Sequence, residues 1–225
     1  MKDNHQISPD IHELCGQFSG HELERILPPG AGTGAVLIPV MELEDGLYIL
    51  FEERSRNIRQ GGDICFPGGM AAEGEPPEET AVRETCEELL LDRQQVRLIA
   101  PMHEVSGPGG ALVRSYLGVI DRYDGNFNRA EAACTFAVPL SWFTKNPPDI
   151  YGARQRTEPG EDFPYEKIAG GRNYRFREQR RQYYFYEVPA EIIVEWNGGA
   201  ERKREGSVTI WGLTAMLLYH FVKKI

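Results

Sequence analysis

Short apolar runs, separated by polar and glycine-rich turns, divide most of the chain. The runs at 35–41 and 47–52 flank a Glu-Asp-Gly turn at 44–46, which is typical of a β-hairpin. Further runs predict strands at 63–66, 95–103, 111–120, 183–188 and 192–196, with a short apolar segment at 136–140. This pattern of many short strands indicates a mixed α/β class.

Two longer segments have the apolar spacing of helices that pack on a sheet. The first follows Pro76-Pro77, because proline suits the first turn of a helix, and the second is IWGLTAMLLYHFV at 210–222. Shorter helices are expected at 21–26 and from Ser141, and the proline- and charge-rich segment 146–173 is expected to be a long surface loop. We predict an N-terminal extension at 1–30 containing the short helix, followed by a single domain at 31–225.

The charge balance narrows the classes of partner. The 225 residues include 25 basic and 34 acidic side chains, which gives a net charge of −9. A protein that binds nucleic acid by neutralising phosphates is usually basic, so we expect no nucleic-acid partner. A small anionic molecule remains compatible with this charge, because a local basic patch or a metal ion can outweigh the global field.

The N-terminal sequence and the cysteines indicate the compartment. MKDNHQISPDIHEL lacks the basic and apolar regions of a signal peptide, and no apolar run approaches the roughly 20 residues that cross a bilayer. Cys15, Cys65, Cys86 and Cys134 are scattered without a CxxC pair, which favours buried free thiols over a zinc site or a disulfide framework. We therefore expect a cytoplasmic protein without a membrane partner, and we allow for a homodimer.

An acidic helix follows a glycine-rich loop between 68 and 91. Glu84, Glu87 and Glu88 share one helix face, and Glu84 and Glu88 lie one turn apart, about 6 Å along the axis. Carboxylates in this arrangement suit Mg²⁺ or Mn²⁺, and the loop glycines allow a backbone carbonyl to approach the same ion. The alternative is that these acids form only a solvated helix face.

The spacing of this segment resembles the box of the Nudix hydrolase family, G-x5-E-x7-R-E-U-x-E-E-x-G-U with U apolar. The matching residues are Gly69, Glu75, Arg83, Glu84, Glu87 and Glu88. The resemblance implies an α/β/α sandwich with a mixed central sheet that uses Mg²⁺ or Mn²⁺ to hydrolyse a diphosphate. It implies that Glu84, Glu87 and Glu88 are catalytic and bind the metal together with Gly69. Glu75 and Arg83 are expected to form a structural salt bridge, with Arg83 facing away from the metal.

Two residues depart from the box. Thr85 stands at an apolar position, where its methyl group can still pack, and Leu90 stands where the box has glycine. Glycine at that position ends a helix in the left-handed conformation, which costs a residue with a side chain about 1 kcal/mol. We therefore expect the helix to continue past Leu90, or a different cap to form near Asp92.

The stretch before the box, LFEERSRNIRQGGDICFPGG, resembles the signature of the coenzyme A pyrophosphatase branch, L-L-T-x-R-S-x3-R-x3-G-x3-F-P-G-G. Arg54, Ser55 and Arg59 match and are the expected substrate-binding residues, although the interval from Arg59 to Gly62 is one residue shorter and Glu52 replaces the threonine. The resemblance implies cleavage of CoA or its thioesters to 3′,5′-ADP and a 4′-phosphopantetheine product. The arginines of this loop could instead neutralise neighbouring acids.

The sequence leaves open alternative functions of the chain and alternative roles for three residues. The chain could be a Nudix diphosphatase for ADP-ribose or another nucleoside diphosphate derivative, or a Nudix fold that senses a nucleotide without cleaving it. Glu131 could add a carboxylate to the site, His103 could act near the metal or be structural, and Trp211 could pack in the core or stack on adenine.

Overall fold

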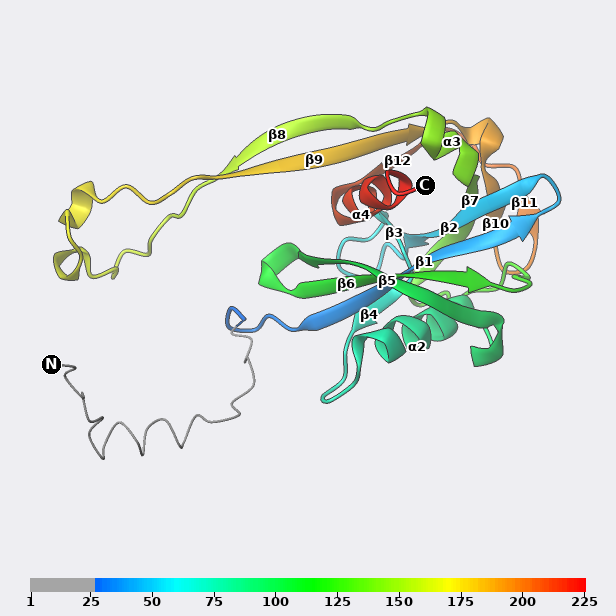
Figure 1. Ribbon diagram of the computed structural model, residues 1–225, viewed down its shortest axis with the longest axis horizontal. Coiled ribbons are helices and arrows are strands. Elements are labelled where there is room, and N and C mark those ends of the chain that lie inside the picture. The colour runs from blue at the N-terminus through cyan, green and yellow to red at the C-terminus, as the bar shows by residue number, and fades with distance from the viewer. Residues whose placement is uncertain (1–26) are drawn as a thin grey trace, which may run out of the picture.

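The computed structural model describes residues 27–225, and it places most of them around one mixed sheet (Figure 1). The predicted helix at 21–26 and Cys15 lie outside the described residues. The main sheet has the strand order β11-β10-β7-β2-β1-β6-β5, with β3 paired to β2 and β4 paired to β1. Its strands are β1 Thr33–Leu43, β2 Gly46–Arg54, β3 Ile64–Cys65, β4 Gly68–Met70, β5 Val96–Ser106, β6 Leu112–Ile120, β7 Ala132–Pro139, β10 Val194–Trp196 and β11 Glu201–Arg202.

The central pair β1–β6 is parallel, whereas β1–β2 and β2–β7 are antiparallel, so the predicted mixed sheet is confirmed. Helices cover both faces of this sheet, α2 (Pro77–Leu89) on one and α4 (Gly212–Val222) with α3 (Leu140–Lys145) on the other (Figure 1). Residues of β2 alternate between the two faces, because successive side chains of a strand point to opposite sides. Leu50 packs with the α2 cluster, and Phe51 packs with the α4 cluster.

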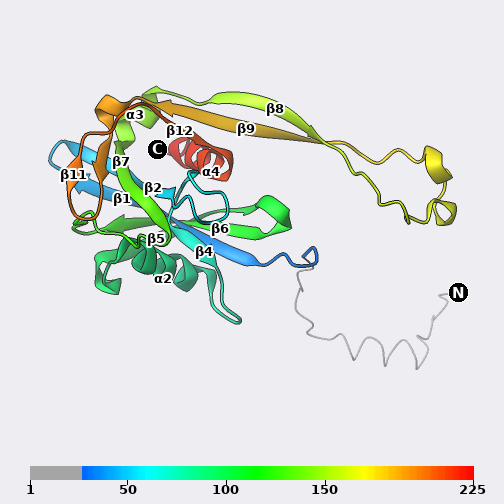
Figure 2. The same ribbon diagram turned by 180° about the vertical axis from the view of Figure 1, so that it is seen from behind.

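A second sheet has the order β12-β9-β8 and consists of β8 Asp149–Gln155, β9 Gln179–Val188 and β12 Val208–Trp211. The β8–β9 hairpin projects from the body of the molecule as a long arm (Figures 1 and 2). The prediction of a continuous surface loop at 146–173 is wrong for 149–155. All seven residues of β8 are exposed, so the strand has no apolar alternation by which the sequence could reveal it.

The remaining boundaries differ from the sequence-based expectations by a few residues. The closing helix begins at Gly212, because 208–211 pair with β9 as β12. Short 3-10 helices connect the strands at Arg93–Gln95 (η1), Pro108–Gly110 (η2), Tyr165–Lys167 (η3), Gly171–Asn173 (η4) and Ala190–Ile192 (η5). No helix of the described part of the chain is long and apolar enough to cross a membrane.

The prediction that α2 continues past Leu90 is wrong. The helix ends at Leu89, and Leu90 itself adopts the left-handed conformation with φ 51° and ψ 44°. The N–H of Leu91 donates to the carbonyl of Cys86 at 3.0 Å, which is the long-range hydrogen bond of a Schellman C-cap. Leucine therefore fills the structural role that glycine has in the box. The expected cap at Asp92 exists, but it starts η1 rather than ending α2.

Candidate active site

An ion pair fastens the loop before α2 to the helix. The Arg83 guanidinium donates to both carboxylate oxygens of Glu75, with Nε–Oε1 2.8 Å and Nη2–Oε2 3.0 Å. Glu75 also accepts hydrogen bonds from the Ala72 N–H and the Thr80 hydroxyl. These four hydrogen bonds fix the loop conformation, and they hold the pKa of Glu75 down at about 2, chiefly through the bonds from Arg83.

Arg83 also supplies positive charge to the acidic helix face. Its Nη2 lies 2.9 Å from Glu84 Oε1, and its Nη1 donates to Glu87 Oε2 at 3.1 Å. The expectation that Arg83 faces away from the metal ligands is therefore wrong, since its guanidinium contacts the candidate ligands Glu84 and Glu87 as well as Glu75. This contact reduces the repulsion between carboxylates that share one face of a helix.

Glu84 and Glu88 both lie against the two glycines of β4. The N–H of Gly68 donates to Glu88 Oε2 at 2.8 Å. The Glu84 carboxyl lies so close to Gly69 that a Cβ at that position would be 2.5 Å from Glu84 Cδ. The carboxylates of Glu84 and Glu88 are thus gathered against β4, beside the central strand β1, whereas Glu87, one residue before Glu88, is exposed toward solvent.

Two further carboxylates belong to this site. Glu52 of β2 is 1% exposed and lies on the α2 side of the strand, two residues after Leu50. Glu131 receives a hydrogen bond from Asn128 at 3.0 Å, and its charge acts on Glu52, Glu84 and Glu88. Sequence analysis named Glu131 as a candidate carboxylate, but it considered Glu52 only as a departure from the family signature. The position of Glu52 within an apolar strand could have indicated that this residue is buried.

Burial governs the protonation of this group. Desolvation raises the pKa of Glu52, of Glu88 and, more weakly, of Glu84. The mutual repulsion of Glu52 and Glu88 raises the pKa of Glu88 further, whereas Arg54 lowers that of Glu52. A bound cation would favour the charged forms of these carboxylates, because an opposite charge in a poorly solvated site acts strongly.

The carboxylate oxygens of the candidate site are chemically suitable ligands for a divalent cation. Among the described residues, no three acidic, histidine or cysteine side chains converge as metal ligands, in agreement with the pairing of Arg83 with Glu84 and Glu87. The Oε1 atom of Glu52 is nevertheless buried, and it accepts no hydrogen bond from any described residue. Oxygen ligands of this kind suit Mg²⁺ and Mn²⁺. Glu84 and Glu88 are the residues best placed to hold such an ion.

The basic loop at 55–63 lies beside these carboxylates. Arg54 donates from Nε to the Arg59 carbonyl at 3.4 Å, and Ser55 is buried with its N–H bonded to the Glu131 carbonyl at 2.7 Å. These two residues therefore shape the loop in this conformation. Arg59 is exposed, as is Arg56, and neither forms an ion pair with a described residue. Both guanidinium groups are available to an anionic ligand.

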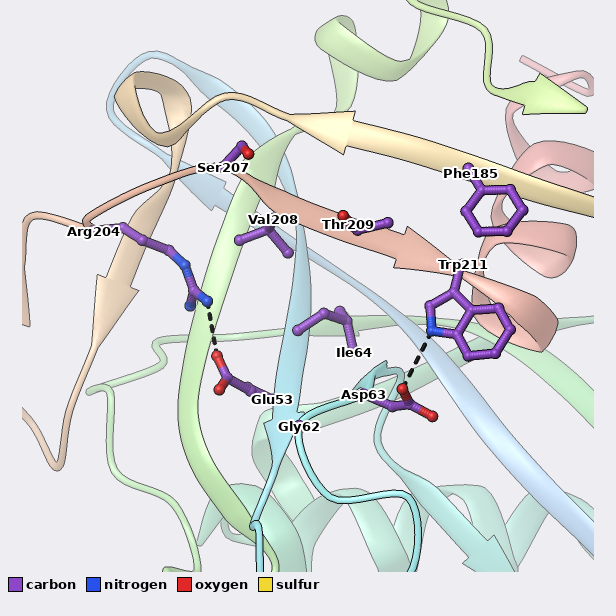
Figure 3. Close-up of a pocket in the computed structure, with 10 residues that line it drawn as sticks. All are labelled: Glu53, Gly62, Asp63, Ile64, Phe185, Arg204, Ser207, Val208, Thr209 and Trp211. Carbon is purple, nitrogen blue, oxygen red and sulfur yellow. Dashed lines mark hydrogen bonds and ion pairs between the residues drawn. The ribbon is translucent and has the colours of Figure 1, made fainter.

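A cavity of about 470 Å³ lies on the other side of β2, outside the carboxylate group (Figure 3). Its walls include the aromatic rings of Phe185 and Trp211, which stack with centroids 6.0 Å apart, and Trp211 Nε1 donates to Asp63 at 3.2 Å. Trp211 is 41% exposed, so the interpretation as core packing is wrong. The opposite wall is formed by Glu53 and Arg204, which are joined by an ion pair of 2.8 Å.

His103 lies away from the acids of α2. Its ring centroid is 5.8 Å from that of His220 in α4, on the opposite face of the sheet. Burial is the main cause that lowers its pKa, which favours the neutral imidazole. This position supports the structural interpretation of His103.

Comparison with known proteins agrees with this geometry. The NUDIX domain model matches residues 32–144, about half of the chain. The chain belongs to the Nudix family. The matched region contains β1 to β7 and α2, and therefore all the carboxylates of the candidate site.

The chain is also similar to individual curated proteins. The chain is 33% identical over 148 residues to the peroxisomal coenzyme A diphosphatase NUDT7 of Mus musculus, covering 62% of each chain. It is 33% identical over 113 residues to an uncharacterized Nudix hydrolase NudL of Photorhabdus laumondii, covering 48% of this chain and 58% of that one. The aligned parts thus span less than two thirds of either relative.

Solved structures with a similar fold include a C. elegans Ap4A hydrolase binary complex, at 19% identity and TM-score 0.43, covering 50% of this chain and 83% of that one. The NUDIX domain of Shewanella oneidensis NrtR with ADP ribose has 16% identity and TM-score 0.42, covering 59% and 87%. Both TM-scores lie below 0.5, so we draw no conclusion from these two likenesses.

Proposed function

We propose that this Nudix hydrolase cleaves the diphosphate of coenzyme A or of its thioesters, giving 3′,5′-ADP and the corresponding 4′-phosphopantetheine. The observation that carries the proposal is the placement of Glu84 and Glu88 against Gly68 and Gly69, next to a loop with two exposed arginines that form no ion pair with a described residue. The likeness to a coenzyme A diphosphatase supports the substrate. Water is consumed, and the bond between the bridging oxygen and one phosphorus breaks.

The cofactor of the proposal is Mg²⁺ or Mn²⁺, held by Glu84 and Glu88 with Glu87 and the Gly69 carbonyl as further ligands. Such an ion would neutralise the diphosphate oxygens and lower the pKa of a bound water. The protein contributes the fixed position of the carboxylates. Arg83 and Glu75 hold the helix and its loop together, so the carboxylates remain against β4.

The basic loop supports recognition of a third phosphate. CoA carries a 3′-phosphate besides its diphosphate, and arginine makes forked, charge-assisted hydrogen bonds with phosphate. Arg59 is the candidate contact because it is exposed and free of ion pairs with described residues, and Arg56 is a second. Arg54 and Ser55 would act by shaping the loop that presents them.

The cavity beside the loop is a candidate site for the adenine ring. Asp63 and Gly62 join the cavity directly to the basic loop, and the exposed face of Trp211 offers a stacking surface. A Trp211→Ala variant is expected to raise KM for CoA while leaving kcat nearly unchanged, because the ring would bind the ground state and transition state equally. An unchanged KM would exclude this position for the adenine.

A substrate panel tests the proposed function. Purified protein is incubated with Mg²⁺ or Mn²⁺ and with CoA, dephospho-CoA or ADP-ribose, and the products are identified by mass spectrometry. We expect 3′,5′-ADP from CoA, a preference for CoA over dephospho-CoA, and loss of turnover with EDTA. A preference for ADP-ribose would favour the alternative diphosphatase, and reversible binding of CoA without products would favour the sensor.

We also propose a homodimer formed through the β8–β9 arm. An isolated two-stranded hairpin is only marginally stable in water, and β8 exposes Ile150 and Tyr151 at 44% and 60%. Residues 149–182 contain eight basic and six acidic side chains in a chain of net charge −9, so the arm complements the acidic body of a second copy. Light scattering should show that the wild type is a dimer. Tyr151→Glu should weaken the dimer, whereas Leu47→Lys, at an exposed site on the body of the molecule, should leave it intact. A monomeric wild type would contradict this.

The thiols bear on localisation. Within the described residues Cys65, Cys86 and Cys134 are free, which suits a reducing compartment. We propose the cytoplasm, although the mouse relative is named peroxisomal. Fluorescence microscopy of the tagged protein in its native cell would distinguish the two.

A further inference from the structure

Glu52 is a carboxylate whose burial has no compensation in the described structure. Its side chain is 1% exposed, and its Oε1 accepts no hydrogen bond from any described residue. Buried polar groups are nearly always hydrogen-bonded, because a buried group without a partner loses the solvation free energy of water and gains no compensating interaction. An unpartnered carboxylate oxygen inside the protein therefore requires an explanation.

The register of β2 directs this carboxylate toward the acidic helix. Glu52 lies opposite Cys65 of β3 and Thr135 of β7, so it is held in the middle of three strands. Leu50, two residues earlier on the same face, packs with Ala81, Val82 and Leu89 of α2. The neighbouring Glu53 points to the opposite face, where Arg204 pairs with it.

The chain that follows β3 brings Glu88 to the same place. Cys65 is followed by Phe66 and Pro67, and then by Gly68, whose N–H holds Glu88. The charge of Glu52 acts on Glu88, and those of Arg54 and Glu131 act on Glu52. Glu52 and Glu88 thus lie close enough for their charges to interact, in a part of the protein from which water is largely excluded.

We propose that Glu52 is a further ligand of the divalent cation, contributed from the sheet while Glu84 and Glu88 are contributed from α2. The inference rests on the metal-binding part of the proposed function. A cation would satisfy the unpartnered oxygen and would also favour the ionised forms of Glu52 and Glu88, which a hydrogen-bond donor to one oxygen would not do. The strand fixes Glu52 more rigidly than a loop would, so the ion would be held between two rigid elements.

The test measures binding of Mn²⁺ rather than turnover. Titration of the protein with Mn²⁺ is followed by the electron paramagnetic resonance signal of the free ion, for the wild type, Glu52→Gln and Glu52→Thr. Glu79→Gln removes an exposed carboxylate in the first turn of the same helix and is the matched control. Circular dichroism and the melting temperature without metal show whether each variant is folded.

We expect both Glu52 variants to bind Mn²⁺ at least about tenfold more weakly than the wild type, since even outer-shell partners of a metal change its affinity by that factor. The control should match the wild type, and the variants should melt without metal at or above the wild-type temperature, because a buried carboxylate has been removed. Wild-type affinity in folded Glu52→Gln and Glu52→Thr, or no binding of Mn²⁺ by the wild type, would overturn the inference.

The two proposals fail in different ways. If the wild type binds Mn²⁺ through Glu52 but releases no product from CoA, the ligand assignment stands and the substrate is wrong. If CoA is cleaved and the Glu52 variants retain full affinity for Mn²⁺, the hydrolase stands and Glu52 is a structural, protonated acid.

Discussion

The Gly68 N–H donates to the Glu88 carboxylate at 2.8 Å, which joins the strand before α2 to the last turns of that helix. The neighbouring residue Gly69 lies against the Glu84 carboxyl, so closely that a Cβ at this position would clash with it. Two consecutive glycines thus set the positions of two acids that lie one helical turn apart. This contact turns an acidic helix face into a site with a defined shape.

Replacement of Gly69 by alanine should impair activity more than stability. The new Cβ would lie 2.5 Å from Glu84 Cδ, and the flexible end of Glu84 would move to make room. A displacement of about 1 Å in a catalytic group costs on the order of 10²-fold in rate. The check is kcat/KM for CoA together with the melting temperature. Gly152→Ala, which meets nothing within 4 Å, is the control, and equal rates in both variants would contradict the prediction.

Acid should destabilise the protein through Glu75. Its pKa in the folded state is about 2 against an ordinary value of 4.5, because the ionised form is hydrogen-bonded to Arg83. The stabilisation is therefore complete above pH 4.5 and is lost as pH falls toward 2. Urea denaturation across this interval should show a weaker pH dependence for Glu75→Gln than for the wild type. Glu73→Gln, at an exposed position in the same loop, should keep the wild-type slope, and identical slopes for all three would count against the role of Glu75.

Leu90→Gly should stabilise the protein. Leu90 has φ 51° and its side chain is 59% exposed, so glycine relieves backbone strain without removing core contacts. The expected gain is about 1 kcal/mol in the free energy of unfolding, reduced by the greater freedom of glycine in the unfolded chain. Leu90→Ala keeps the strain and serves as the comparison. A loss of stability in Leu90→Gly would show that the leucine side chain has a role of its own.

Arg204→Ala should destabilise the protein by about 3 kcal/mol, because it removes the less exposed of the two arginines that pair with the buried Glu195 and also the partner of Glu53. Arg204 pairs with Glu53 at 2.8 Å and with Glu195 at 2.6 Å, and the Glu195 side chain is 1% exposed. Arg202 also contacts Glu195 but is half exposed, so Arg202→Ala should cost less than about 1 kcal/mol. Chemical denaturation measures both. Similar losses of stability in the two variants would contradict the claim that the more buried arginine contributes more to the free energy of unfolding.

The hairpin, the two main helices and the acidic face could be predicted because each has a local pattern. Short apolar runs around a Glu-Asp-Gly turn predicted β1 and β2, and Pro76-Pro77 marked the start of α2. The strand β8 could not be predicted, because all of its residues are exposed and it is ordered by pairing with β9, which is distant in the sequence. The left-handed Leu90 was missed because tertiary contacts of Leu89 and Leu91, both buried, outweigh the local strain.

A part of the candidate site could be predicted because some of its residues lie close together on one helix. Spacing on one helix brought Glu84 and Glu88 together, but the contribution of Glu52 depends on how β2 and α2 meet across 36 residues of sequence. The sequence left Trp211 with two interpretations, core packing or stacking on adenine. The sequence could not show that β12 turns its ring toward a cavity shared with Asp63.

Turnover of CoA by Glu88→Gln tests the central claim most directly. Glutamine keeps the size of the side chain and an oxygen for the Gly68 N–H, while it removes the charge that would hold the cation. With Mg²⁺ or Mn²⁺ present and the fold verified by circular dichroism, we predict that formation of 3′,5′-ADP falls by at least about 10²-fold, which corresponds to roughly 2.7 kcal/mol of transition-state stabilisation. Full turnover in the folded variant would contradict the account.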